Sequence, residues 1–228
     1  MKVLYFLPIA AAALLSLCPA RAQEPELLRF QQAAGDRSIL FRGKAAERHS
    51  IPAEGHPYWS NSEFLTGDIV FEDRLYRDLP INIDVCVHRA LVQLSAGWIS
   101  ISLAPAEVQS IRLDGHLYTG VGPEDTLPEG FYEVLGDGPD RVYKRVTKQL
   151  TTATEADRIY HYYSAQSAWY LRDREGRTTR VRNRYALLRA FPPERRRHIR
   201  EQLRESSANR ADVPFDLWCQ AALRAAAL

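Results

Sequence analysis

Residues 64–103 read FLTGDIVFEDRLYRDLPINIDVCVHRALVQLSAGWISISL, and apolar and polar side chains alternate along them in short runs. Alternation with a period of two is typical of β-strands that bury one face. Short breaks at residues 72–74, 88–90 and 95–97 fit tight reversals of the chain. The stretch therefore predicts an antiparallel meander, and the rest of the chain must supply a cover for its inner face.

Strand signals continue to residue 180, and helical periodicity follows. Because strands precede helices, an alternating βαβ arrangement is excluded. The sequence thus predicts an α+β fold: a twisted antiparallel β-meander, or a partly open barrel, followed by C-terminal helices. The last helix presents one apolar stripe to cover the sheet, formed by Phe215, Trp218, Cys219, Ala222 and Leu223.

The N-terminus has the pattern of an export signal. Lys2 precedes an apolar run over residues 3–17, and small residues flank Arg21 before Gln23. We expect cleavage before Gln23. Cys18 raises a lipoprotein alternative, but Leu17 stands where a lipidation motif needs a small residue. No later stretch has the length that a bilayer requires, so we expect no transmembrane segment after signal cleavage.

Four segments follow from these patterns. We expect a signal peptide over residues 1–22, an N-terminal extension over 23–57, an antiparallel sheet region over 58–180, and a helical region packed on the sheet over 181–228. The expected localisation is periplasmic, outer-membrane associated or secreted.

Charge is unevenly distributed along the chain. Residues 23–170 hold 14 basic and 21 acidic groups, whereas residues 171–228 hold 14 arginines and 7 acids. Such asymmetry can mark a polyanion partner, two halves that attract each other, or a solvated helical face. We favour the last two, because exported proteins seldom meet nucleic acid, and we expect no nucleic-acid partner.

Two cysteines remain after signal cleavage, Cys86 and Cys219. Export permits a disulfide between them. The alternative is a pair of unpaired buried thiols, which behave as small hydrophobic groups.

The common catalytic and metal-binding motifs are missing. The six histidines form no His-x-x-x-His pair, and the chain has neither a Gly-x-Ser-x-Gly elbow nor a phosphate-binding loop. We therefore assign no catalytic residue, no metal ligand and no cofactor.

Aromatic residues are concentrated in one predicted strand pair. Their side chains can stack on sugars or anchor a protein partner, and cross-strand aromatic pairs also stabilise a sheet without binding anything. Both interpretations stay open for this group, which consists of Tyr160, Tyr162, Tyr163, Trp169 and Tyr170.

The chain resembles a family of uncharacterised exported proteins of Gram-negative envelopes. The resemblance rests on LFRG at 40–43, GHPYWSNSEFLTGDIVFEDRLYRDLPINIDVCVHRALVQ at 55–93, ISLAPAEVQSIRLDGHLYT at 101–119, GFYEVL at 130–135 and LLRAFPPERRRHIREQL at 187–203. That family often has Tyr-Asp where this chain has Ile83-Asp84. The resemblance implies export and one continuous architecture, but it supplies no activity or catalytic residue.

Two functional hypotheses follow. The first is a non-catalytic binding or scaffolding module that meets an envelope protein or glycan. The second is a hydrolase acting on envelope polymers, with carboxylates gathered from separate strands.

Overall fold

The computed structural model describes residues 35–155, 158–204 and 206–227, and residues 36–228 form one compact unit. Its strands are β1 (Lys44–Ala45), β2 (Leu65–Phe71), β3 (Arg74–Asp84), β4 (Arg89–Gln93), β5 (Ser100–Leu103), β6 (Val108–Leu113), β7 (His116–Val121), β8 (Gly130–Leu135), β9 (Arg141–Glu155), β10 (Arg158–Arg172) and β11 (Thr178–Val181). Its helices are α2 (Arg184–Ala190), α3 (Pro193–Arg204) and α4 (Phe215–Ala227), with short 3-10 turns η1 (Gly35–Arg37), η2 (Ile39–Arg42), η3 (Pro105–Glu107) and η4 (Ser207–Asn209).

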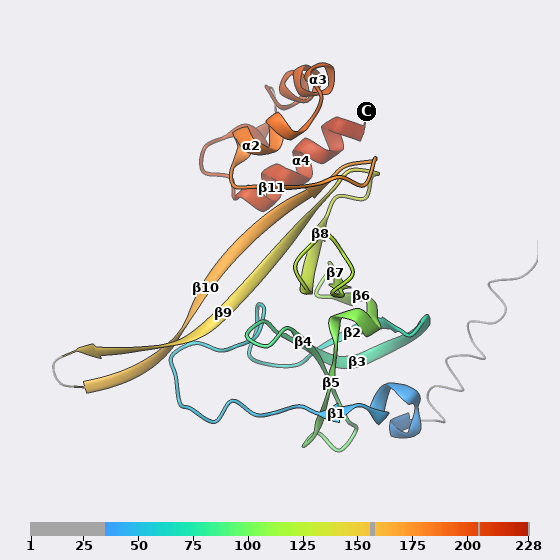
Figure 1. Ribbon diagram of the computed structural model, residues 1–228, viewed down its shortest axis with the longest axis vertical. Helices are drawn as coiled ribbons and strands as arrows, with labels where there is room; N and C mark the ends of the chain where they lie inside the picture. Colours follow the sequence, from blue (N-terminus) through green and yellow to red (C-terminus); the bar gives the residue numbers. More distant parts are fainter. Residues whose placement is uncertain (1–34, 156–157, 205, 228) are drawn as a thin grey trace, which may run out of the picture. The chain divides into compact units, whose positions relative to one another are not determined.

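All eleven strands form one antiparallel sheet in the order β1-β5-β4-β3-β2-β6-β7-β8-β9-β10-β11, with its two ends unjoined in the described residues. The helices gather at the β11 end (Figure 1). The predicted α+β fold, with an open antiparallel sheet and C-terminal helices, is therefore confirmed. Residues 151–155 lack the apolar alternation typical of a strand, yet β9 continues to Glu155 in unbroken register with β10.

Tight turns set the register of the first strands. Glu72 and Asp73 both have positive φ, +46° and +59°, as a two-residue type I′ hairpin requires. Asp114 and Gly115 repeat this geometry between β6 and β7, with φ of +50° and +76°. The acidic pair at residues 72–73 is thus a turn element, where short polar side chains tolerate the left-handed region.

The third strand ends earlier than the alternation predicts. Residues 85–87 were expected to continue it, but β3 stops at Asp84. The reason is local: Asp84 Oδ1 accepts hydrogen bonds from the backbone N–H of Cys86 and of Val87, at 2.9 and 3.2 Å. A side chain that bonds its own following backbone makes a turn in place of a ladder.

A crossover joins the two halves of the sheet. From β5 the chain passes through η3 into β6, which pairs with β2. This connection lies against Gly120 of β7, where an added Cβ would stand only 2.0 Å from the Pro105 carbonyl oxygen. The close approach of two backbones explains glycine at this position.

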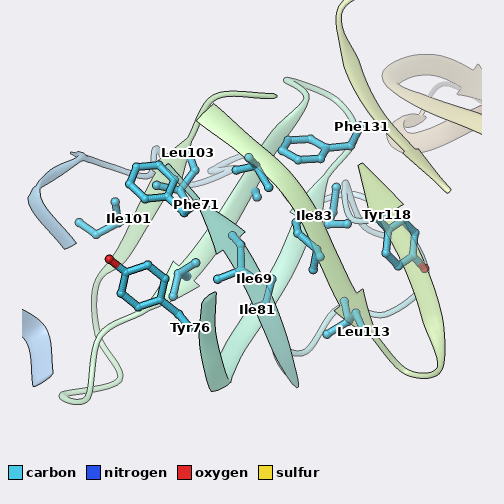
Figure 2. Close-up of a cluster of buried hydrophobic side chains, with 14 of the residues drawn as sticks. Ile69, Phe71, Tyr76, Ile81, Ile83, Ile101, Leu103, Leu113, Tyr118 and Phe131 are labelled. Carbon is cyan, nitrogen blue, oxygen red and sulfur yellow. The ribbon is translucent and has the colours of Figure 1, made fainter. Parts of the chain in front are cut away.

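Apolar side chains form separate clusters. The first gathers residues of β2 to β9, among them Ile69, Ile81 and Ile83 (Figure 2). The second joins β8 to β11 with the three helices, and Trp218 and Cys219 of α4 lie inside it. The predicted stripe of the last helix is therefore buried from Trp218 onward, against the strands near β11 rather than against the meander of residues 64–103.

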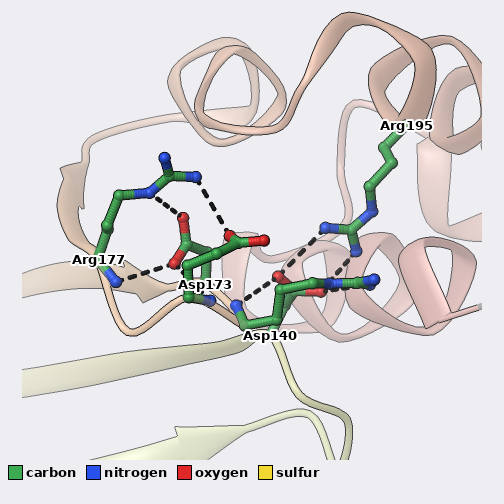
Figure 3. Close-up of polar contacts among 6 residues, drawn as sticks. Asp140, Asp173, Arg177 and Arg195 are labelled. Carbon is green, nitrogen blue, oxygen red and sulfur yellow. Dashed lines mark hydrogen bonds and ion pairs between the residues drawn. The ribbon is translucent and has the colours of Figure 1, made fainter.

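Ion pairs fasten the helices to the strand ends. Asp140 is 3 % exposed, and Arg195 of α3 contacts both of its carboxylate oxygens (Figure 3). Burial alone raises the pKa of Asp140, but the hydrogen bonds and charge of Arg195, with the hydrogen bonds of Arg174, together outweigh it and lower that pKa. Arg172 likewise pairs with Asp125. Part of the basic half thus neutralises the acidic half, which was one of the favoured interpretations of the charge distribution.

No helix in the described part of the chain is both long and apolar enough to cross a membrane.

His88 should make stability depend on pH. Burial, and then the Arg145 guanidinium 3.0 Å from Nε2, lower the pKa of His88 to about 4, against 6.5 when unfolded. The unfolded chain therefore binds the proton first, and stability is lost as pH falls from 6.5 towards 4, by about 2–3 kcal/mol. We expect His88→Asn to flatten urea-unfolding free energies over this range, since Asn tolerates the φ of +50° found there. Equal slopes for both proteins would contradict this assignment.

Candidate functional site

The segment that follows β1 runs out to the β9–β10 hairpin and turns back, and we call its residues 46–58 the strap (Figure 1). Its start is tied to the β4–β5 hairpin: Ala46 N donates to the Ser100 carbonyl at 2.8 Å, and Arg48 Nη2 donates to the Trp98 carbonyl at 3.0 Å. These bonds hold the strap against the edge of the first meander.

The middle and the end of the strap have anchors of their own. Glu54 forms a parallel bridge to β10, with Glu54 N donating to the His161 carbonyl at 2.8 Å and Tyr163 N donating to the Glu54 carbonyl at 3.0 Å. At the end, Val85 N donates to the Pro57 carbonyl at 3.0 Å. The strap thus links the β5 edge, the β10 edge and the turn after β3.

A cavity of about 590 Å³ lies beside the strap. A second hollow of about 490 Å³ borders residues 44–49 and reaches Asp84. The wall opposite the strap comes from β4, β5 and the turn between them, where Trp98 is 79 % and Ile99 52 % exposed. Strap residues lining the larger cavity include Arg48, His49, Ile51, His56 and Tyr58, and Tyr163 comes from β10.

Asp84 and His49 form the central polar pair. Asp84 is 2 % exposed, and its Oδ2 lies 2.5 Å from His49 Nε2. Its other oxygen accepts the two backbone N–H bonds that end β3. A buried carboxylate is tolerated only when its oxygens are bonded in this way. Because His49 lines both hollows, the pair stands at the boundary between core and cavity.

Two tyrosines fix the His49 ring. Tyr58 and Tyr163 meet it edge-on, with centroid distances of 6.4 and 6.1 Å. Burial, followed by the charge of Asp84, raises the pKa of Tyr58, and burial also raises that of Tyr163. Both hydroxyls therefore stay protonated at neutral pH and are available to a ligand as hydrogen-bond donors.

Lys148 of β9 anchors the end of the strap. Its ammonium donates to the carbonyls of Tyr58 and His56, at 2.5 and 3.1 Å. Burial lowers the pKa of Lys148, and burial followed by the charge of the nearby ammonium lowers the pKa of His56. The Lys148 ammonium thus binds backbone carbonyls of the strap.

Cys86 borders this cluster but is not activated. Burial, then the charge of Asp84, raises its pKa to about 11, so it is a thiol at neutral pH. The disulfide considered from the sequence is absent, because Cys86 and Cys219 are both free. Their surroundings differ: Cys86 follows β3, whereas Cys219 lies in the cluster of helices.

A second polar chain joins the sheet to α4. Glu133 Oε1 lies 2.6 Å from His116 Nδ1, and Lys144 Nζ bridges Glu133 and Asp216 at 3.4 and 2.5 Å. Burial lowers the pKa of Lys144, but Asp216 and then Glu133 outweigh it, so the pKa is raised. A cavity of about 600 Å³ opens beside His116, and Leu223 of α4 lines it. We interpret this series of polar contacts as the interactions that hold α4 on the sheet.

The five predicted aromatic residues do not form one surface. Tyr163 lines the strap cavity, and Tyr160 and Tyr162 lie together with ring centroids 6.0 Å apart. Trp169 Nε1 donates to Asp216 Oδ1 at 2.6 Å, and Tyr170 packs edge-on against Tyr132 at 6.1 Å. Trp169 packs against the second apolar cluster, and Tyr170 packs against a third cluster, formed by Val121, Leu127, Tyr132 and Tyr143.

Sequence reasoning missed His49, Asp84, Tyr58 and Trp98 as members of one site. Thirty-five positions separate His49 from Asp84, and no motif spans them. The signal that existed was Asp84 within an otherwise apolar run, since an acid in a buried strand needs a partner.

Comparison with known proteins adds no relative: no family model matches the chain, nor does any curated protein or solved structure. Within the described residues, no group of three His, Cys, Asp or Glu side chains is placed to hold a metal ion.

Lys148→Met should loosen the strap. Met keeps the apolar stem but leaves two strap carbonyls without a donor, which should reduce the free energy of unfolding by about 1–3 kcal/mol. Lys44→Met is the matched control: among the described residues, the Lys44 ammonium has only its exposed pair with Glu47, and its loss should change stability by less than about 0.5 kcal/mol. Urea unfolding measures both. Equal effects would contradict the anchoring role of Lys148.

Proposed function

We propose that this chain is a non-catalytic binding module of the Gram-negative cell envelope, and that the strap cavity is its binding site. The observation that carries the proposal is the cavity of about 590 Å³ with Trp98 standing 79 % exposed at its wall. That volume lies within the usual range of ligand sites, which combine apolar walls with a few polar groups. A large aromatic left uncovered beside such a hollow is a common mark of an interaction site.

The state of the polar groups favours binding over catalysis. Asp84 is committed to two backbone N–H groups and to His49, and Lys148 to two strap carbonyls. Cys86 keeps its proton at neutral pH. These groups hold the site in shape, and a preformed site loses little entropy when a ligand enters.

We infer that the ligand is an envelope glycan or a segment of an envelope protein. Trp98, Tyr58 and Tyr163 offer aromatic faces that stack on sugars or on apolar side chains. Export itself rests on the expected signal peptide over residues 1–22 and on the family resemblance. Together these support a location in the periplasm, at the outer membrane, or outside the cell.

A hydrolase acting on envelope polymers is the second candidate. One observation favours it: a buried carboxylate orients the imidazole of His49, which borders the cavity, and this is the arrangement of a general base. One substitution distinguishes the two candidate functions. In a hydrolase, His49→Gln would abolish the release of soluble fragments from envelope polymers, whereas a binding module releases none in either form.

We also infer that the sheet curls towards the partly open barrel expected from the sequence. Eight residues separate Ala46, bonded to β5, from Glu54, bonded to β10, and they span at most about 28 Å. Eight strand spacings separate β5 from β10, which in a flat sheet would be about 38 Å. The strap can join both edges only if β9 and β10 bend back over the first strands.

Site-specific photocrosslinking tests the proposed site. A photoreactive phenylalanine analogue replaces Trp98 in one variant and Tyr185 in the control, because Tyr185 of α2 is also an exposed aromatic, at 64 %. We expect discrete envelope adducts from position 98 and none from position 185. Fractionation of the same cells locates the chain.

Adducts of equal yield from both positions would contradict a specific site in the strap cavity. Recovery of the full chain in the cytoplasm, with its first 22 residues intact, would contradict the envelope assignment.

A further inference from the structure

The outer edge of β10 is paired with the strap at His161 and Tyr163 and with β11 from Trp169 onward. Between these two contacts the edge is open. Fifteen consecutive residues of β10 pair with β9 without a register shift, so alternate residues direct their N–H and C=O groups to opposite edges. His161 and Tyr163 direct theirs outward, to Glu54 of the strap. By the same alternation Ala165 and Ser167 also point outward, and beyond them β11 pairs with β10 from Trp169 onward.

Nothing in the described part of the chain occupies this interval. Ala165, Gln166 and Ser167 are all exposed. No described residue donates to or accepts from the outward backbone groups of Ala165 and Ser167. The open edge, which we define as residues 164–168, therefore presents a short row of unpaired outward backbone groups.

Devices that normally protect an edge are missing from this interval. Natural sheets block exposed edges with lysine, proline or a bulge. Residues 164–168 read SAQSA, which contains no charge and no proline, and the register shows no bulge. Their small side chains leave the backbone accessible from both faces.

Aromatic residues bracket the open edge. Tyr163 and Trp169 belong to one face of β10, with Ala165 and Ser167 between them, since side chains on a strand alternate. Tyr162 and Tyr170 bracket Ser164, Gln166 and Ala168 in the same way on the other face. A strand added at this edge would therefore lie between aromatic positions of β10 on both faces.

We propose that this edge binds a short extended peptide segment of a partner protein by strand addition. The interval of five residues corresponds to about 17 Å of extended chain. Backbone bonds to Ala165 and Ser167 would supply affinity, and the bracketed small residues would accept alternate side chains of the peptide. The site is distinct from the strap cavity and does not depend on the function proposed for it.

A second copy of this chain does not fit the interval. The β10 strand is 15 residues long, so the same strand from another molecule would run into β11 at one end and into Glu54 at the other. Only a segment whose two ends turn away from the sheet fits, as in a loop or a terminal tail. This restriction favours a peptide partner over self-association.

The proposal is tested by titrating a defined peptide into the ¹⁵N-labelled protein that remains after the expected signal cleavage, residues 23–228. The probe is N-acetyl-Thr-Val-Thr-Val-Thr-amide at millimolar concentration, and its matched control carries proline at the central position. We expect the probe to shift the amide resonances of Ala165 and Ser167 more than any others, and the proline peptide to leave them unchanged. No shift at these amides, or equal shifts from both peptides, would overturn the proposal.

Two variants sharpen the result. Ser167→Pro removes one outward N–H at an edge position where proline is tolerated, and it should weaken binding about tenfold. Ser167→Ala keeps the backbone donor and should bind as the parent does. If Ser167→Pro does not fold, Ser167→Lys replaces it as an edge-blocking variant. Undiminished binding to a folded edge-blocked variant would also overturn the proposal.

Discussion

The pairing of β9 with β10 is the constraint on which the rest of this structure depends. Fifteen residue pairs run without a register shift, from Arg141 opposite Arg172 to Glu155 opposite Arg158. Val146 of this ladder lies in the first apolar cluster, and Val142 and Leu171 lie in the second. One hairpin therefore contributes to each of these two apolar clusters, and a slip of one residue would turn all of its side chains to the wrong faces.

The same hairpin also organises the proposed binding surfaces. Lys148 holds the end of the strap, and the backbone of His161 and Tyr163 holds its middle. The cavity beside the strap exists because a loop without secondary structure of its own is fixed at three places to a rigid sheet. Binding residues on loops held by a scaffold are the common arrangement in proteins.

Much of the fold could be predicted from the sequence. The alternation in residues 64–103 marks β2 to β5, and the apolar stripe from Trp218 to Leu223 marks the buried face of α4. The failures have local causes. The cap that Asp84 places on the following backbone ends β3 early, and pairing with β10 extends β9 through a polar stretch that has no apolar alternation. Both effects depend on a single side chain or on a distant strand.

The site was harder to predict than the fold. His49 and Asp84 come from a loop and a strand end, and only the path of the strap brings them together. The aromatic group of β10 was visible in the sequence, but its members divide between the cavity, the exposed part of the hairpin and two cores. Composition cannot show which part of the β10 edge is open, because this depends on where Glu54 bonds to β10 and where the pairing with β11 begins.

Amide hydrogen exchange along β10, resolved by residue, tests the central claim most directly. The Tyr163 amide donates to Glu54 of the strap, whereas the amides of Ala165 and Ser167 have no partner in the described part of the chain. We expect slow exchange at Tyr163 and fast exchange at Ala165 and Ser167, because a bonded amide exchanges only when its bond opens. Exchange at Tyr163 as fast as at Ala165 would show instead that the strap is not bonded to β10.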